Sequence, residues 1–436
     1  FISLANLYNA CATPQELEAF RQAVAKLVNS LSWSPVPVRL EAIGPERLIL
    51  QVALGEIGWI AAHWEQIVAG YPLRLAPSSR FPQSVLSATG TQLPVVNGDW
   101  LADAAMRPPL YNELLGLPGR FGNLQHILRL DVDANIRRGQ VRRAGVLQSR
   151  ETRFNRVVER HPSATGALWL SYDFAGNTGR QSIIEHPLGP AATEPGRVPF
   201  RHDGMKALFH LPNGFTAFSI NDVRGDRLDR SVAEIDKDRW GLTRATQSGA
   251  ACLQCHSSGP IGAMDEVRAA IDAERGVSKE LREAVFALYP PDVELAALVE
   301  ADALKTRNAM LSAGIDPGLR IWGLDPLRAL VRAYRRPLDL ARAAADLGAE
   351  PEELRRQLGE LAGPNALAAR ALRQGIVRRE SFNAVLAEIA AAATGGDRLP
   401  GPLPSAATLP GSDDRLELVL ASDADAFEAG QAVTFT

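Results

Sequence analysis

Three side chains that could carry chemistry stand together in the segment Cys252-Leu253-Gln254-Cys255-His256. Two cysteines three positions apart, with a histidine directly after the second, form the attachment pattern of a c-type haem. Both thiols can reach the two vinyl groups on one edge of a porphyrin, and the imidazole then faces the iron. The segment therefore predicts thioether bonds from Cys252 and Cys255, and a proximal iron ligand at His256.

Two other kinds of site use cysteines at this spacing. A thioredoxin-like redox pair needs a βαβ setting and no haem. A structural zinc site needs four ligands, usually including a second Cys/His pair at short spacing, and the sequence has no such pair. The segment favours one covalent haem c over both alternatives.

A low-spin electron carrier needs a second axial ligand on the distal side of its haem, usually a methionine or a histidine. His186 and His202 are the main candidates, because loop histidines near Gly and Pro can be aimed at a ligand and Asp203 could orient a nearby imidazole. Met310 follows His256 at a distance that resembles small class I cytochromes, but it stands in a helical run where core packing is the commoner role. An open sixth position is the remaining alternative.

An arginine-rich stretch lies between residues 137 and 160. It lacks the interleaved aromatic residues and the recognisable module of a nucleic-acid binder, and the net charge of -3 also disfavours nucleic acid. We expect a solvated face with paired carboxylates; alternatively, some guanidinium groups hold haem propionates. The arginines are Arg137, Arg138, Arg142, Arg143, Arg150, Arg153, Arg156 and Arg160.

The composition is that of a soluble globular protein with room for two to four domains: 436 residues, 46% of them hydrophobic and 22% charged. With no apolar run of about 18 residues, no transmembrane segment is expected. The sequence begins at Phe1 without a signal-peptide pattern. Because haem c is attached outside the bacterial cytoplasm, we expect a targeting segment that is not in this sequence and a periplasmic or extracellular location. Cys11 is expected to be a buried apolar residue, or else an intermolecular disulfide partner.

The periodicity of the chain predicts an α+β fold. Residues 1–165 form a mixed N-terminal region, which begins with a helix to residue 31 that Thr13-Pro14-Gln15-Glu16 would cap. Further elements of this region are predicted as strands at 38–42 and 47–53 and helices at 57–68, 100–106, 110–115 and 123–130.

Residues 166–264 are predicted to form a strand-rich, haem-bearing region. Strands are expected at 167–172, 207–210 and 216–220, with turns at Pro212-Asn213-Gly214 and Arg224-Gly225-Asp226. Residues 265–395 are predicted to be helical, with five or six helices. Residues 396–436 form a Pro/Gly-rich linker and an incomplete β segment, with strands at 416–421 and 432–435.

Several stretches of the chain, within roughly residues 1–350, resemble a family of large, secreted bacterial proteins that carry a single c-type cytochrome motif. His186 and His202 fall inside shared motifs, so the resemblance strengthens both as ligand candidates, whereas Met205 stands where the family pattern has Gly. The resemblance also implies that the final strands begin a β domain. The matching stretches are Ser3 to Ala10, Lys26 to Trp33, Tyr172 to Gly176, His186 to Pro190, His202 to Gly204, Leu211 to Phe215 and Cys252 to His256.

The favoured function is electron transfer by one haem c, to or from a redox protein partner or a membrane-associated electron-transfer complex. One alternative is a structural or accessory subunit of an extracytoplasmic assembly, because a haem needs far less protein than 436 residues to enclose it. The other is a haem enzyme of peroxidase type with an open distal site. An electron-transfer protein is favoured over a catalyst, and the sequence is compatible with an oligomer.

Overall fold

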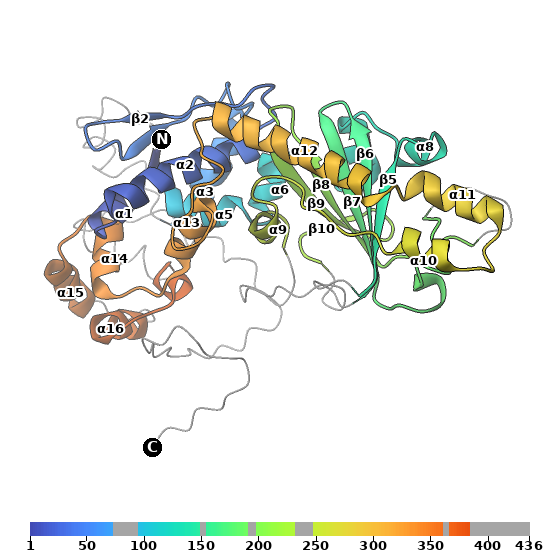
Figure 1. Ribbon diagram of the computed structural model, residues 1–436. Coiled ribbons are helices and arrows are strands. Elements are labelled where there is room, and N and C mark those ends of the chain that lie inside the picture. The colour runs from blue at the N-terminus through green and yellow to red at the C-terminus, as the bar shows by residue number, and fades with distance from the viewer. Residues whose placement is uncertain (73–94, 149–153, 191–197, 232–246, 361–365, 384–436) are drawn as a thin grey trace, which may run out of the picture. The chain divides into compact units, whose positions relative to one another are not determined.

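The computed structural model describes residues 1–72, 95–148, 154–190, 198–231, 247–360 and 366–383. The chain divides into two compact units (Figure 1). The first unit comprises Phe1–Tyr8, Ala12–Tyr71 and Leu93–Tyr334, and the second comprises Asn9–Cys11, Pro72–Gln92 and Arg335–Thr436. Helices and antiparallel strands occur together, and the α+β fold class is confirmed.

A six-stranded antiparallel sheet forms the centre of the first unit, with the strand order β10-β9-β8-β7-β6-β5. Neighbours in sequence are neighbours in the sheet, so the sheet is a meander, although a long connection separates the end of β7 at Asp173 from the start of β8 at Gly204. The expected boundary at residue 165 falls inside it, between β6 and β7. The strands are β5 (Arg142–Val146), β6 (Arg156–Ser163), β7 (Gly166–Asp173), β8 (Gly204–His210), β9 (Thr216–Asp222) and β10 (Arg227–Leu228).

The strand register divides the side chains of this sheet between two faces. Trp169 lies opposite Leu208, which lies opposite Phe218, so these residues share one face. The helix α12 (Asp292–Ser312) covers this face, which we call the α12 face (Figure 1). Asp302 of α12 accepts hydrogen bonds from Trp169 Nε1 at 2.8 Å and from Arg160 Nε at 2.7 Å.

The opposite face carries Tyr172, which is paired with Met205 and with Val157 in the neighbouring strands. Some of the residues that pack on this face come from the segment before the sheet, among them Trp33, whose ring stacks on Phe209 with centroids 6.3 Å apart. Others come from the connection between β7 and β8, among them Phe200, whose ring lies 5.4 Å from that of Tyr172. The helices of the segment before the sheet are α5 (Gly98–Ala105), α6 (Leu110–Leu114), α7 (Phe121–Ile127) and α8 (Val132–Arg137). They agree with the three short helices predicted between residues 100 and 130 and add α8.

The N-terminal part of the first unit holds a small four-stranded sheet with the order β2-β3-β1-β4. The prediction of one helix from residue 1 to residue 31 is wrong at its start, because Ile2–Ser3 pairs with β3 and β4 instead. The predicted cap is confirmed: Thr13 and Glu16 form a reciprocal capping box at the start of the second helix. The elements are β1 (Ile2–Ser3), α1 (Ala5–Asn9), α2 (Pro14–Ser30), β2 (Glu41–Ile43), β3 (Ile49–Gln51), α3 (Ala61–Gly70) and β4 (Val96–Asn97).

The described part of the region after residue 265 is helical, as predicted, and contains at least seven helices rather than five or six. Besides α12 they are α10 (Val267–Ala273), α11 (Lys279–Leu288), α13 (Pro326–Arg335), α14 (Leu340–Leu347), α15 (Pro351–Glu360) and α16 (Ala366–Gln374). None of the described helices is long and apolar enough to cross a membrane. The linker and strands expected after residue 396 lie outside the described residues.

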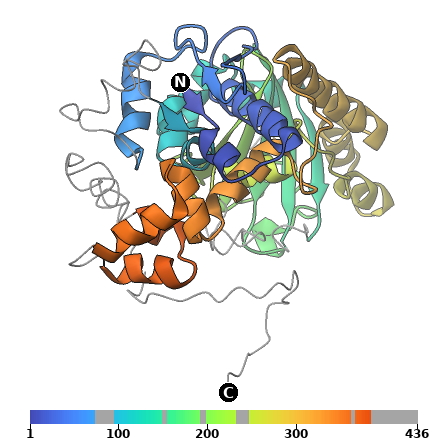
Figure 2. The same cartoon turned by 90° about the vertical axis from the view of Figure 1, so that its left-hand side faces the viewer.

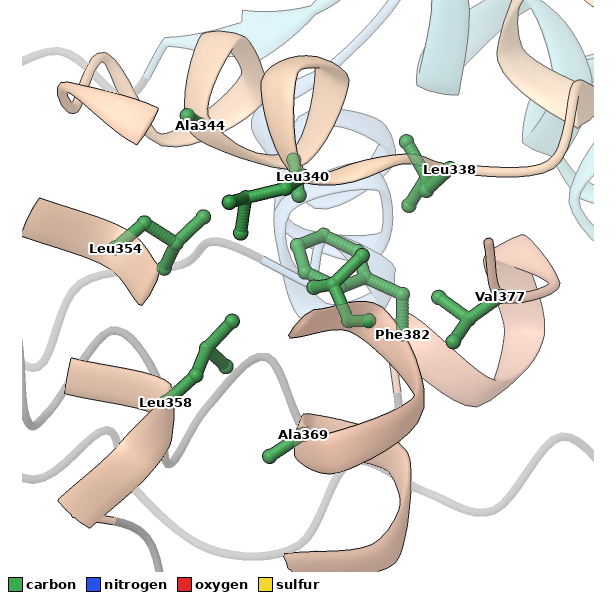
Figure 3. Close-up of a cluster of buried hydrophobic side chains, with 10 residues drawn as sticks. Leu338, Leu340, Ala344, Leu354, Leu358, Ala369, Val377 and Phe382 are labelled. Carbon is green, nitrogen blue, oxygen red and sulfur yellow. The ribbon is translucent and has the colours of Figure 1, made fainter. Parts of the chain in front are cut away.

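The second unit has a core of its own, formed by α14, α15, α16 and the segments beside them (Figure 3). Leu338 and Val377 exchange backbone hydrogen bonds of 2.8 Å across this core. The buried residues are Leu338, Leu340, Ala343, Ala344, Leu354, Leu358, Ala369, Leu372, Val377 and Phe382. Cys11 is exposed, so its interpretation as a buried apolar residue is wrong.

Candidate functional site

The predicted haem-attachment motif lies on a short helix, α9 (Ala250–Cys255), with His256 at its C-cap. The motif spans one helical turn, because the backbone N–H of His256 donates a hydrogen bond of 3.0 Å to the carbonyl oxygen of Cys252. Residues three and four apart share a side of a helix, so Cys252, Cys255 and His256 are neighbours. Cys252 is half-buried and Cys255 is exposed.

The motif belongs to the α12 face. The ring of His256 lies 6.1 Å from that of Phe218, which points to this face from β9. The loop after the motif packs directly on α12: a Cβ atom added to Gly259 would lie 3.0 Å from the Cα atom of Ala303 and 3.1 Å from Oγ1 of Thr306. Gly259 has a φ of +108°, so both its backbone and its surroundings favour glycine.

Tyr111 of α6 contacts both β9 and the motif. Its hydroxyl accepts a hydrogen bond of 2.8 Å from the backbone N–H of Phe218. Burial raises the pKa of Tyr111, and a negative charge on the nearby Cys252 acts in the same direction. Met106 borders the other end of α9, since its carbonyl oxygen lies 2.5 Å from where a Cβ atom on Gly249 would be. The sequence carries no signal for Tyr111 and Met106 as neighbours of the motif, because more than a hundred residues separate them from it.

The geometry of His256 suits an iron ligand. Its Nδ1 atom lies 3.3 Å from the carbonyl oxygen of Gly259. When Nδ1 carries the proton and donates to this carbonyl, the lone pair of Nε2 is available to a metal, which is how a backbone carbonyl orients a metal-bound histidine. Two adjacent thiols and an oriented imidazole are the donor set that haem c requires, so the residues present fit this group.

His202, which was predicted as a distal ligand, does not lie near His256 in the structure. The His202 ring packs edge-on against Tyr172, with centroids 5.0 Å apart, and also lies 6.4 Å from the ring of Phe200. Tyr172 points away from the α12 face, so the sheet separates His202 from the motif. Burial is the main cause that lowers the pKa of His202.

His186 is also far from the motif. Its Nδ1 lies 3.0 Å from the carbonyl oxygen of Val198, and the next residue, Pro187, accepts a hydrogen bond of 2.7 Å from the Tyr289 hydroxyl. Arg143 contacts the same Pro187 carbonyl from β5, which is four strands away from β9. At about 4.8 Å per strand, this separation is about 19 Å. Met310 is 1% exposed within α12, in keeping with core packing.

In the described part of the arginine-rich stretch, residues 142–146 and 156–160 lie in β5 and β6, whereas Arg150 and Arg153 lie outside the described residues. The expectation of a solvated face is wrong at Arg143, which is fully buried. Strand alternation turns this side chain inward, where it forms an ion pair with Glu159. Burial would raise the pKa of Glu159, but Arg143 and His161 lower it to about 2. The expected pairing with carboxylates is confirmed at Arg142–Glu294, Arg156–Asp173 and Arg160–Asp302, with N–O distances of 2.6, 2.6 and 2.7 Å.

The surroundings of the motif bear on the two alternatives to a haem site, a thioredoxin-like redox pair and a structural zinc site. The sheet beside α9 is an antiparallel meander, whereas a thioredoxin-like pair belongs to a βαβ unit. Among the described residues, no group of three or more His, Cys, Asp and Glu side chains is placed to hold a metal ion by itself. Comparison with family models, with curated proteins and with solved structures finds no match to this chain. The assignment of a function therefore rests on the residues of the site.

Proposed function

We propose that the chain is a monohaem c-type cytochrome of the periplasm or the cell exterior, and that it exchanges electrons with a protein partner or a larger complex. The observation that supports this best is the arrangement of the motif. Two thiols share one turn of α9, and the imidazole that follows is oriented by the Gly259 carbonyl at 3.3 Å.

Each residue of the motif has a distinct task in this proposal. Cys252 and Cys255 anchor the porphyrin edge, and His256 presents Nε2 to the iron while Gly259 fixes the plane of its ring. The haem supplies a one-electron couple. The protein sets the potential of that couple through burial, hydrogen bonds and the axial ligands. Tyr111 and Phe218 exclude water from the side of the motif that faces β9, because both are buried.

The test is to express the chain in a bacterial host with a haem-attachment system and to stain denatured protein for covalent haem. We expect the native sequence to retain haem after denaturation, and the Cys252→Ser, Cys255→Ser double variant to lose it. Cys11→Ser is the matched control, because it removes a cysteine outside the motif and should leave the haem in place. Native protein without covalent haem would refute the proposal.

The position of the two histidines favours a second candidate, a haem enzyme with an open distal side. Neither His202 nor His186 lies beside His256, and the two histidines were the predicted distal ligands. Visible spectra with carbon monoxide and with peroxide separate the two functions. A low-spin spectrum that neither addition changes supports electron transfer, whereas a high-spin spectrum that both additions shift supports the enzyme.

A further inference from the structure

Asp302 fixes the middle of α12 to the sheet beside the haem motif. Its carboxylate accepts two hydrogen bonds from Arg160 of β6, from Nε at 2.7 Å and from Nη2 at 2.9 Å. A third bond, of 2.8 Å, comes from Trp169 Nε1 of β7. Bonds from a guanidinium to both oxygens of a carboxylate are strong and directional. Asp302 therefore sets the position of this part of α12 relative to β6 and β7.

His210 of β8 supports the same part of α12. Its Nδ1 accepts a hydrogen bond of 3.2 Å from the backbone N–H of Ala167, so the proton of the neutral ring is on Nε2. Burial lowers the pKa of His210, which keeps the ring neutral near pH 7. Nε2 donates to the backbone carbonyl of Asp302 at 3.1 Å and lies 3.3 Å from Oγ1 of Thr306. These contacts fix the side chain of Thr306, which is 2% exposed.

Thr306 and Ala303 form the surface of α12 on which Gly259 packs. A Cβ atom added to Gly259 would lie 3.0 Å from the Cα atom of Ala303 and 3.1 Å from Oγ1 of Thr306, so the two backbones are in close contact. On its other side, Gly259 adjoins His256: its N–H donates to the His256 carbonyl at 3.3 Å, and its own carbonyl oxygen lies 3.3 Å from Nδ1 of His256. A shift of α12 at Thr306 would therefore move the carbonyl that orients the imidazole.

We infer that Asp302 and Thr306 are positioning residues for His256. Through them, α12 holds the Gly259 carbonyl where it keeps the His256 proton on Nδ1 and fixes the plane of the ring. The effect on a haem rests on the proposed function, whereas the effect on the tautomer of His256 does not. A histidine that donates firmly from Nδ1 is a more basic ligand, and the axial ligand sets the potential of the iron. Because a basic ligand favours the oxidised state, a looser contact should raise the potential.

The first test needs no haem. Nitrogen NMR of the whole protein with labelled histidine reports which ring nitrogen of His256 carries the proton, and the His256 signals are identified by their absence in His256→Ala. We expect the native protein to carry this proton on Nδ1. Thr306→Val keeps the shape of the side chain but places a larger methyl group against Gly259, so part of the Nδ1–H population should be lost. Thr306→Ser retains the hydroxyl and should keep the native signals. His210 keeps its bond to the Asp302 carbonyl in both variants, so both should fold.

The second test measures the midpoint potential of the haem-loaded protein by redox titration. Asp302→Asn keeps the size of the side chain but removes the charge that strengthens its bonds to Arg160. Asp302→Asn and Thr306→Val should retain covalent haem, which depends on the two cysteines of the motif, and should have a higher potential than the native protein. Leu295→Ala is the matched control. It truncates a side chain of α12 that is 3% exposed, about two turns before Asp302. It should lower the melting temperature and leave the potential and the tautomer unchanged.

The outcomes separate this inference from the proposed function. Native protein without covalent haem refutes the proposed function, and the tautomer of His256 then decides the inference alone. The inference is overturned if Thr306→Val keeps the native tautomer, or if it keeps the native potential in haem-loaded protein. It is also overturned if Leu295→Ala raises the potential as much, because general loss of stability would then explain the shift. A melting curve shows whether Asp302→Asn folds; if it does not, Thr306→Val carries the test.

Discussion

Arg143 and Glu159 form an ion pair with no exposed surface, between two adjacent strands. Removal of one partner leaves the other charge buried, which typically costs about 3–5 kcal/mol. We therefore expect Glu159→Gln to lower the free energy of unfolding by about that amount, measured by urea denaturation. Glu294→Gln is the control, since it breaks a partly exposed pair with Arg142 and should cost at most about 1 kcal/mol. Equal losses in both variants would contradict the role of burial.

The same carboxylate makes stability depend on pH. The pKa of Glu159 is about 2 in the folded chain, below the value of about 4.3 expected in the unfolded chain. A depressed pKa means that the stabilisation is complete above about pH 4.3 and is lost as the pH falls through about 2. We expect the free energy of unfolding to decrease over this range, and to decrease less in Glu159→Gln. Identical slopes for the two proteins would show that other carboxylates dominate.

At the scale of residues, the arrangement of Cys252, Cys255 and His256 on one helical turn could be predicted from sequence because the three residues are neighbours in the chain. The placement of His202 could not, since it depends on which face of the sheet the adjoining residues take. A shift of one residue in strand register moves a side chain to the other face. Arg143 illustrates the same point, because its neighbour Arg142 faces α12 and pairs with Glu294 while Arg143 is buried.

The helix that carries the motif begins at a glycine that no other residue can replace easily. Gly249 has a φ of +89°, and an added Cβ atom would lie 2.5 Å from the Met106 carbonyl oxygen. We expect Gly249→Ala to cost about 3 kcal/mol or more and to lower the yield of haem-loaded protein, measured by thermal melting and by haem stain. Gly139→Ala should cost only about 1 kcal/mol, because Gly139 has a φ of +67° but no atom within 4 Å of the added group.

Short sequence patterns correctly predicted those elements whose contacts lie between residues close together in the sequence. The capping box at Thr13 is contained in four consecutive residues, and the hairpin turn at Pro212 to Gly214 is equally short. The strand Ile2–Ser3 was missed, because it exists only through its pairing with Leu50 and Val96. Two residues have too little periodicity to show that they form a strand, and the nearby helical pattern predicted a helix instead.

At the scale of the molecule, the division into two units predicts two unfolding events. All seven tryptophans lie between Trp33 and Trp322, within the ranges of the first unit, so tryptophan fluorescence reports on that unit alone. Leu354→Ala removes a fully buried side chain from the core of the second unit, which should cost about 2–5 kcal/mol there. In thermal unfolding of this variant, part of the helical circular dichroism signal should then be lost at a lower temperature than in the native protein. The midpoint of the tryptophan fluorescence transition should stay unchanged.

Leu367→Ala provides the control for this experiment. Leu367 lies in the same unit but is 57% exposed, so its truncation should change stability by less than about 0.5 kcal/mol. A fluorescence midpoint that moves together with the circular dichroism in Leu354→Ala would show that the two units unfold as one.

The order of the elements along the chain determines which neighbours of the motif precede it and which follow it. The meander pairs each strand with the one that precedes it in the chain, so every pairing in the sheet joins strands that are consecutive in sequence (Figure 2, where the strands appear in green). The segment from Cys252 to His256 follows the last strand of this sheet, and the helix that packs on Gly259 comes later still in the sequence. If a haem is attached at Cys252 and Cys255 as we propose, the sheet beside their helix consists entirely of residues that precede the motif, and α12, which packs on Gly259, consists of residues that follow it.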